Sequence, residues 1–304
     1  MTKQILITGG SGFIGQHLVD DWLKAGHQVV VFTRRPQWVV QRWQGRVLAV
    51  DSLARLNQSF DWLVNLAGEG IADQRWSNKR KQALRQSRVD LTRELLQWAQ
   101  VSHQKFELVL SGSAVGYYGS YDNDAVQPQA FTEQNMQGRG FAAELCRDWE
   151  FAAMDFAELS ERVVILRTGI VLGANGGMLK RLWLPFSLGL GGKIGSGEQV
   201  LSWIHLQDYC RAVHFLCDHN ITGPVNMTAP QAVTNQAFTM ALASVVRRPA
   251  LLPMPRLVAT SLFGEMSELL LQGQRVRPQT LLQHGFEYDY ADINAALQQI
   301  QANW

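Results

Sequence analysis

A glycine-rich segment near the start of the chain, Thr8–Gly15, constrains the fold more than any other feature of the sequence. It holds four glycines and lies directly between an apolar run, Ile5–Ile7, and a stretch with the spacing of an amphipathic helix. The hydrophobic residues at helical spacing are Phe13, Leu18, Val19, Trp22 and Leu23. Gly26 ends this stretch, and the apolar run Val29–Phe32 follows. The opening of the chain therefore predicts a strand, a glycine turn, a helix and a second, parallel strand.

The glycines fit both the GxxGxxG and the GxGxxG spacing. Glycine lets a loop turn tightly and bring its backbone N–H groups against a pyrophosphate, and the following helix N-terminus adds a partial positive charge. An ordinary tight turn is the alternative, but the position between a strand and a helix favours dinucleotide binding. The residues predicted to contact the cofactor here are Gly9, Ser11, Gly12, Phe13, Ile14 and Gly15.

The end of the second apolar run bears on which dinucleotide is bound. An NAD-selective site places an acidic residue there to accept hydrogen bonds from the ribose hydroxyls. This chain instead has Thr33, Arg34 and Arg35, and no acidic residue from Gln28 to Leu48. Because a guanidinium group fits a 2′-phosphate, the sequence favours NADP(H). Asp51, after the third apolar run, is predicted either to accept from the adenine amine or to cap a turn.

Apolar runs and helical patterns alternate through the first half of the chain. Further strands are expected at 47–50, 62–66, 108–110 and 163–166, and helices at 78–100 and 142–159. Such alternation predicts an α/β fold with a Rossmann-like, doubly wound parallel sheet. We expect residues 1–170 to form the dinucleotide-binding domain, with 198–226 returning to it, and 171–304 to form a smaller α/β substrate region.

Composition narrows the classes of partner. Lys and Arg number 28 and Asp and Glu 26, so the net charge of +2 argues against nucleic acid or an anionic membrane as the default partner. The three cysteines form no disulfide framework, no cluster has metal-ligand spacing, and no apolar run is long enough to span a bilayer. We expect a cytoplasmic protein without a metal. The sequence leaves the oligomeric state open.

Several motifs in order along the chain carry a family resemblance. They are TGGSGFIG at 8–15, NLAGE at 65–69, SGSAVGYYG at 111–119, ELCRDWE at 144–150, LRTGIVLG at 166–173, WIHLQD at 203–208 and GQRV at 273–276. With them the chain resembles the extended-type short-chain dehydrogenase/reductases of the NAD-dependent epimerase/dehydratase superfamily, in particular the atypical subgroup called epimerase family proteins. The resemblance implies further cofactor-binding residues: Leu66, Ala67, Gly68, Arg88, Ile170 and Val171.

The chain departs from that superfamily at the usual catalytic pair, a tyrosine followed four residues later by a lysine. There is no lysine between Lys105 and Lys180, and no tyrosine between Tyr121 and Tyr209. The remaining catalytic candidates follow the fifth apolar run. Ser113 matches the superfamily's serine, or it bonds only to backbone. Tyr117 and Tyr118 either donate a proton or pack without chemistry.

These observations lead to two hypotheses about function. The first is an NADP(H)-binding oxidoreductase- or epimerase-like enzyme with an altered proton-transfer apparatus, acting on an unidentified small molecule. The second is a catalytically silent NADP(H)-binding protein that senses cofactor state or serves as a scaffold. Both require the same cofactor.

Replacing Arg34 with alanine tests the choice of cofactor. Losing a charge-assisted phosphate contact costs roughly 1.5–3 kcal/mol, so NADPH binding should weaken while NADH binding changes little. Isothermal titration of the R34A variant with both dinucleotides measures the difference. Equal weakening of the two would remove the reason for choosing NADP(H).

Overall fold

A seven-stranded sheet forms the centre of the molecule in the computed structural model, which describes residues 1–122 and 129–304. The strand order is β10-β6-β5-β4-β1-β2-β3, and all neighbouring strands are parallel. The strands are β1 (Gln4–Thr8), β2 (Gln28–Phe32), β3 (Leu48–Val50), β4 (Trp62–Asn65), β5 (Leu108–Ala114), β6 (Val163–Thr168) and β10 (Gly223–Met227). The predicted doubly wound parallel sheet is confirmed.

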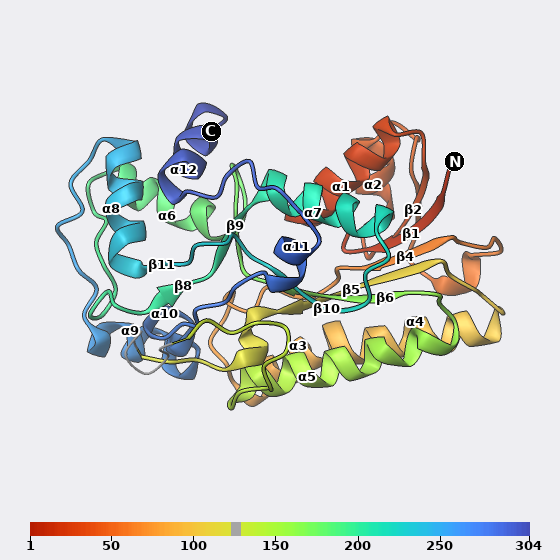
Figure 1. Ribbon diagram of the computed structural model, residues 1–304, viewed down its shortest axis with the longest axis horizontal. Coiled ribbons are helices and arrows are strands. Elements are labelled where there is room, and N and C mark those ends of the chain that lie inside the picture. Colours follow the sequence, from red (N-terminus) through yellow and green to blue (C-terminus); the bar gives the residue numbers. More distant parts are fainter. Residues whose placement is uncertain (123–128) are drawn as a thin grey trace.

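Helices cover both faces of this sheet (Figure 1). One face carries α1 (Phe13–Lys24), α2 (Pro36–Arg42) and α7 (Leu206–Asp218), and the other carries α3 (Asn78–Arg85), α4 (Leu91–Val101) and α5 (Phe141–Met154). Side chains alternate between the layers: Ile5 and Ile7 face the α1 side, whereas Leu6 packs on the opposite side, and all three are fully buried. Burial on both faces explains why the strands read as continuous apolar runs.

Two of the predicted helices differ from the sequence pattern. The helix expected over 78–100 is broken by a π-helical turn, Gln86–Asp90, between α3 and α4. The helix expected over 142–159 ends at Met154 and continues as a short 3-10 turn. A π-turn shifts the helix phase by one residue, a feature that hydrophobic periodicity does not reveal.

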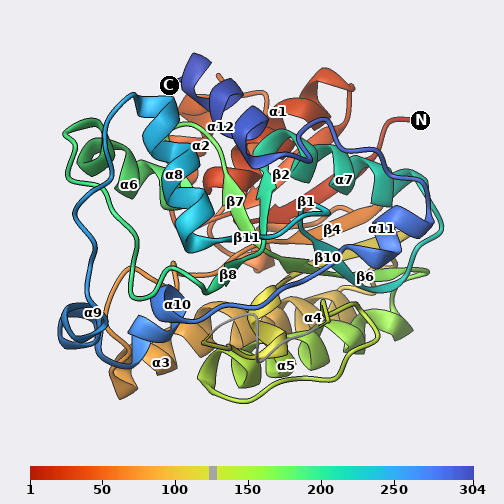
Figure 2. The ribbon, with the colours of Figure 1, turned by 60° about the vertical axis from the view of Figure 1, so that its left-hand side comes forward.

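The smaller part of the molecule contains two pairs of short strands and several helices (Figure 2). Strand β7 (Ile170–Leu172) pairs with β9 (Trp203–His205), and β8 (Val200–Leu201) pairs with β11 (Val233–Thr234). The helices of this part are α6 (Gly177–Ser187), α8 (Asn235–Val246), α9 (Arg256–Phe263), α10 (Glu268–Leu271) and α12 (Ile293–Ala302). Helix α11 (Gln279–Gln283) instead lies beside β10 and α7, where Leu281 joins the core of the large sheet. Among the described residues, no helix combines the length and the hydrophobicity needed to span a membrane.

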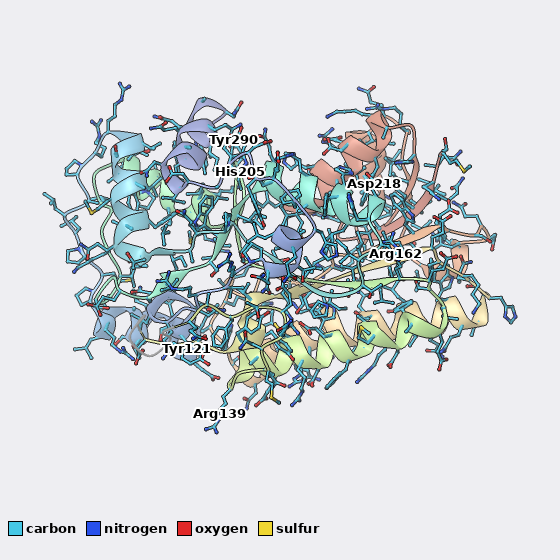
Figure 3. All side chains as sticks on the ribbon, in the orientation of Figure 1. Tyr121, Arg139, Arg162, His205, Asp218 and Tyr290 are labelled. Carbon is cyan, nitrogen blue, oxygen red and sulfur yellow. The ribbon has the colours of Figure 1, made fainter. Side chains whose placement is uncertain are left out.

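A buried carboxylate fastens the C-terminal segment to α7. Asp208 is fully buried and accepts hydrogen bonds from the backbone N–H groups of Asp289 and Tyr290 at 3.0 and 2.8 Å. The Tyr290 ring lies tilted against the ring of His205, with centroids 4.0 Å apart, and His205 caps α7 through Nδ1 (Figure 3). Asp208 therefore binds backbone N–H groups of a segment about eighty residues further along the chain.

Replacing Asp208 with alanine should lower the free energy of unfolding by about 2–4 kcal/mol, because two buried N–H groups lose their acceptor. Urea denaturation followed by circular dichroism measures this. Asp289→Ala is the matched control, since that side chain is 55% exposed and shares Arg211 with Asp208. Equal destabilisation by the two substitutions would contradict the assignment.

Candidate functional site

Three loops leave the sheet together at the carboxyl ends of β1, β2 and β4. Thr8 is paired in register with Phe32 on one side and with Asn65 on the other. The segments that begin at Gly9, Thr33 and Leu66 therefore start at one edge of the sheet. In parallel α/β folds this edge, at the point where the strand order reverses, is where ligands bind.

The glycine loop is packed too closely for side chains at two positions. A Cβ added to Gly9, whose φ is +72°, would lie 2.6 Å from the carbonyl carbon and oxygen of Leu66. A Cβ at Gly15 would overlap the carbonyl oxygen of Gly9. The loop thus lies directly against Leu66 and Ala67, so two sets of predicted cofactor residues are in contact.

The N-terminus of α1 is open toward this edge. Its N-cap is Gly12, no described side chain caps it, and its first turn has no acidic residue. The first N–H groups of a helix have no partner within the helix. Together with the helix dipole, these groups form a positive end suited to a pyrophosphate.

Buried hydrogen bonds hold the loop after β4 in position. The hydroxyl of Thr8 donates to Asn65 Oδ1 at 2.7 Å and accepts from the backbone N–H of Ala67 at 3.2 Å. The Asn65 amide donates to the Thr92 hydroxyl at 2.8 Å, and so does the indole of Trp149 at 3.1 Å. These bonds tie the edge of the sheet to the helices beneath it.

Arg34 projects from the β2 end into solvent, and its side chain is 89% exposed. Its ion pair is with Glu69, at 3.6 Å, across the edge of the sheet. Glu69 is also bound by the buried Arg80, which donates to the carbonyl of Gly70 at 2.6 Å as well. Arg34 therefore lies near the loop after β4, where a cofactor's adenosine end would lie, and it remains accessible to a phosphate.

The other predicted residues at the β2 and β3 ends differ in their surroundings. The Thr33 hydroxyl accepts from the Arg35 N–H at 3.2 Å, which shapes the turn, and the Arg35 guanidinium lies 5.7 Å from the ring of Trp38. Asp51 is paired with Arg55 at 2.8 Å. This ion pair with a side chain of its own turn favours neither of the two roles predicted for Asp51.

Arg88 braces the loop after β4 from the π-helical turn. A Cβ at Gly68 would lie 2.9 Å from the Arg88 guanidinium carbon, and Nη2 of this guanidinium donates to the Glu69 carbonyl at 2.8 Å. The guanidinium also lies 5.4 Å from the ring of Trp149. Burial lowers the pKa of Arg88 below its usual value. In this structure Arg88 supports the loop.

Phe13 joins the glycine loop to the predicted nicotinamide side of the site. Its ring fills the space that side chains would need at Gly176, and a Cβ at Gly173 would lie 2.9 Å from its Cζ. Both glycines follow β7, the strand that contains Ile170 and Val171. Through the Phe13 ring, the segment that follows Ile170 and Val171 contacts the start of α1, where the cofactor is predicted to bind.

The helix that carries the superfamily's catalytic pair is apolar at the corresponding positions. Phe141 packs on Trp76 with ring centroids 5.1 Å apart, and Leu145 is buried beside it. Cys146 is also buried, and burial raises the pKa of its thiol to about 11. None of these side chains is suited to proton exchange near neutral pH.

A buried ion pair between β6 and α5 contacts the catalytic candidates. Arg167 binds both carboxylate oxygens of Glu150, at 2.9 and 2.8 Å. Although burial opposes the charge, hydrogen bonds to Glu150 raise the pKa of Arg167 above its ordinary value. Ser113, paired in register with Arg167, donates its hydroxyl to Glu150 Oε1 at 2.6 Å. The Ser113 hydroxyl is therefore fixed by a side chain, not by backbone alone.

Arg167 also fixes the two tyrosines. The hydroxyl of Tyr118 accepts from Arg167 at 3.0 Å and donates to Asn226 at 2.7 Å; burial raises the pKa of Tyr118 to about 12. Tyr118 is fully buried, so it presents no surface to a substrate. The ring of Tyr117 stacks 3.6 Å from the Arg167 guanidinium, and its hydroxyl bonds to none of the described residues.

The sequence analysis missed the charged residues that organise this site. Glu150, Arg167 and Glu69 stand inside the motifs ELCRDWE, LRTGIVLG and NLAGE, but isolated charges in apolar stretches were the only available signal. A charge inside an apolar strand or on the apolar face of a helix needs a buried partner. That rule predicts that Arg167 and Glu150 each have a buried partner of opposite charge. It does not say which residue that partner is.

Comparison with known proteins agrees with these features. The profile of the NAD dependent epimerase/dehydratase family matches residues 5–228, and a domain of unknown function, DUF1731, matches residues 254–300. Epimerase family protein Mb2239 of Mycobacterium bovis is 40% identical over 297 residues, covering 96% of each chain. Epimerase family protein YfhF of Bacillus subtilis is 34% identical over 304 residues, covering 98% of each.

Solved structures give the same result. The crystal structure of human epimerase family protein SDR39U1 with NADPH is similar with a TM-score of 0.87 and 32% identity, covering 99% of this chain and 100% of that chain. UDP-glucuronic acid 4-epimerase from Bacillus cereus, in complex with UDP-glucuronic acid and NAD, has a TM-score of 0.77 at 18% identity and 98% coverage of both chains. The second likeness shows the fold alone.

Removing the Glu150 carboxylate tests the buried ion pair. Glu150→Ala leaves the Arg167 charge buried without its partner, so the free energy of unfolding should fall by about 3–5 kcal/mol. Chemical denaturation measures the change. Glu144→Ala, on the same helix with a side chain 51% exposed, should cost less than about 1 kcal/mol. A small effect at Glu150 would show that the pair does not hold the site together.

Proposed function

Because the chain belongs to the NAD dependent epimerase/dehydratase family, we propose that it is an NADP(H)-dependent oxidoreductase or epimerase acting on a small molecule without a Tyr/Lys pair. The observation that carries the proposal is the meeting of an uncapped helix end, a side-chain-free glycine turn and an exposed arginine at one edge of the sheet. The glycine turn and the helix end together suit the pyrophosphate of a dinucleotide, and the arginine suits a 2′-phosphate.

The residues present fit the cofactor in charge and in space. Gly9 and Gly15 let the turn pack tightly against the Leu66 and Gly9 carbonyls, and the start of α1 supplies N–H groups to a pyrophosphate. Arg34 meets the 2′-phosphate, since no acidic residue at the β2 end competes for a ribose hydroxyl. The human relative SDR39U1 was crystallised with NADPH, which supports the same choice.

When bound, the nicotinamide supplies hydride transfer. The chain's own residues handle the proton and the substrate oxygen. Ser113 is 4% exposed; its hydroxyl donates to Glu150 and keeps lone pairs that can accept a hydrogen bond from a substrate hydroxyl. Tyr117 exchanges the proton, because its ring is fixed on Arg167 and its hydroxyl is available. Tyr118 is left out because both of its hydroxyl bonds are made inside the protein.

One observation favours the alternative of a silent NADP(H)-binding protein. The helix expected to hold the usual pair offers only Phe141 and Leu145, or Ala142 and Cys146, at that spacing. A protein that only reads cofactor state needs no proton donor there. The two functions make opposite predictions about hydride transfer.

Incubating the protein with NADPH carrying deuterium at C4 of the nicotinamide and a metabolite extract separates the two functions. We expect stereospecific transfer of deuterium to a small molecule, detected by mass spectrometry. Ser113→Ala and Tyr117→Phe should each lower the transfer rate by about 10²–10⁴-fold, the usual contribution of a positioned proton-transfer group.

Ser111→Ala is the matched control for Ser113. Ser111 lies on the same strand, is buried, and its hydroxyl has no hydrogen-bond partner among the described residues. The control should leave transfer unchanged. The absence of transfer across the extract, while NADPH still binds, would contradict the enzymatic function and favour the silent protein.

A further inference from the structure

Two segments at one end of the molecule expose an unusual amount of apolar surface. The first, residues 180–195, contains the end of α6, and the second, residues 247–262, leads into α9 and contains most of it. Both lie at the left end of Figures 1 and 2. They contain seven of the eight leucines that are exposed among the described residues, each between 55% and 82% exposed. These leucines, called here the leucine face, are Leu184, Leu188, Leu190, Leu251, Leu252, Leu257 and Leu262.

The two segments lie side by side. The N–H of Leu252 donates to the Gly191 carbonyl at 3.1 Å, and the N–H of Met254 donates to the Lys193 carbonyl at 2.9 Å. Arg248 Nε donates to the Ser187 carbonyl at 3.1 Å. These contacts bring the backbone at Leu251 and Leu252 beside the backbone at Leu188 and Leu190, although the two pairs are far apart in the sequence. Leu257 and Leu262 follow on α9, which continues the second segment.

Positive charge is concentrated on the same two segments. Residues 180–195 and 247–262 contain six Lys and Arg and no Asp or Glu, although the whole chain has 28 of the former and 26 of the latter. Arg181 pairs with Asp73, and Arg256 pairs with Asp122. Lys180, Arg247 and Arg248 form no ion pair with any residue in the described part of the chain. The net charge of +2 conceals this local excess.

We propose that the leucine face and its cations bind the anionic lipid surface of a membrane. Exposed leucines beside lysine and arginine are the side chains that insert at the headgroup boundary and attract acidic lipids. The two segments lie at one end of the molecule's longest axis (Figure 1). A second copy seated on this face would bring the same cations together, with no acidic residue in either segment to pair with them.

Cosedimentation with lipid vesicles at low ionic strength tests the proposal on the full chain. Vesicles of equal parts phosphatidylcholine and phosphatidylglycerol should bind the protein, whereas phosphatidylcholine alone should not. Replacing Arg247 and Arg248 with glutamine should weaken binding roughly thirtyfold, since each cation near an anionic surface contributes about 1 kcal/mol. Replacing Leu251 and Leu257 with serine should weaken it by at least about tenfold.

Leu48→Ser is the matched control, because Leu48 is 53% exposed on β3, outside both segments. This variant should bind vesicles as the unmodified protein does, and all variants should keep their thermal unfolding midpoints. Failure to bind anionic vesicles would overturn the proposal. So would variants at Leu251 and Leu257 that bind normally, or light scattering showing that these substitutions instead convert a dimer to a monomer.

Discussion

The close packing of the glycine turn against the loop after β4 is the constraint on which the site depends. Gly9 has no room for a side chain because the Leu66 carbonyl lies beside it, and Gly15 has none because of the Gly9 carbonyl. This contact fixes where α1 begins and leaves its first N–H groups facing the edge of the sheet. Phe13 then extends the same contact to the segment after β7, so one turn joins the two ends of the predicted cofactor site.

Arginine side chains organise the polar part of the site, each through a different partner. Arg80 is buried and Arg88 is partly buried, and they hold the loop after β4 through its carbonyls and through Glu69. Arg167 is buried between Glu150 and the two tyrosines, and it thereby positions Ser113 and Tyr117 without a lysine. Arg34 alone among these is exposed, which is what a phosphate ligand requires. Burial thus separates the arginines that build the site from the one that we propose binds the phosphate.

Much of the fold could be predicted from the sequence because its signals are local. Apolar runs such as Ile5–Ile7 and the glycine spacing at 8–15 specify the strands, the turn and the parallel sheet. The π-turn at Gln86–Asp90 and the Glu150–Arg167 pair could not be predicted, since each depends on contacts between distant elements. Chain-wide charge likewise conceals how Arg247 and Arg248 lie beside the leucine face, which only the folded arrangement reveals.

The central claim is that the open end of α1 and the exposed Arg34 together bind a phosphorylated dinucleotide. Calorimetric titration of the purified, nucleotide-free protein with NADPH tests it most directly. The account predicts one site per chain with micromolar or tighter affinity for NADPH and markedly weaker binding of NADH. No measurable heat from NADPH up to millimolar concentration, in protein shown to be folded, would contradict it.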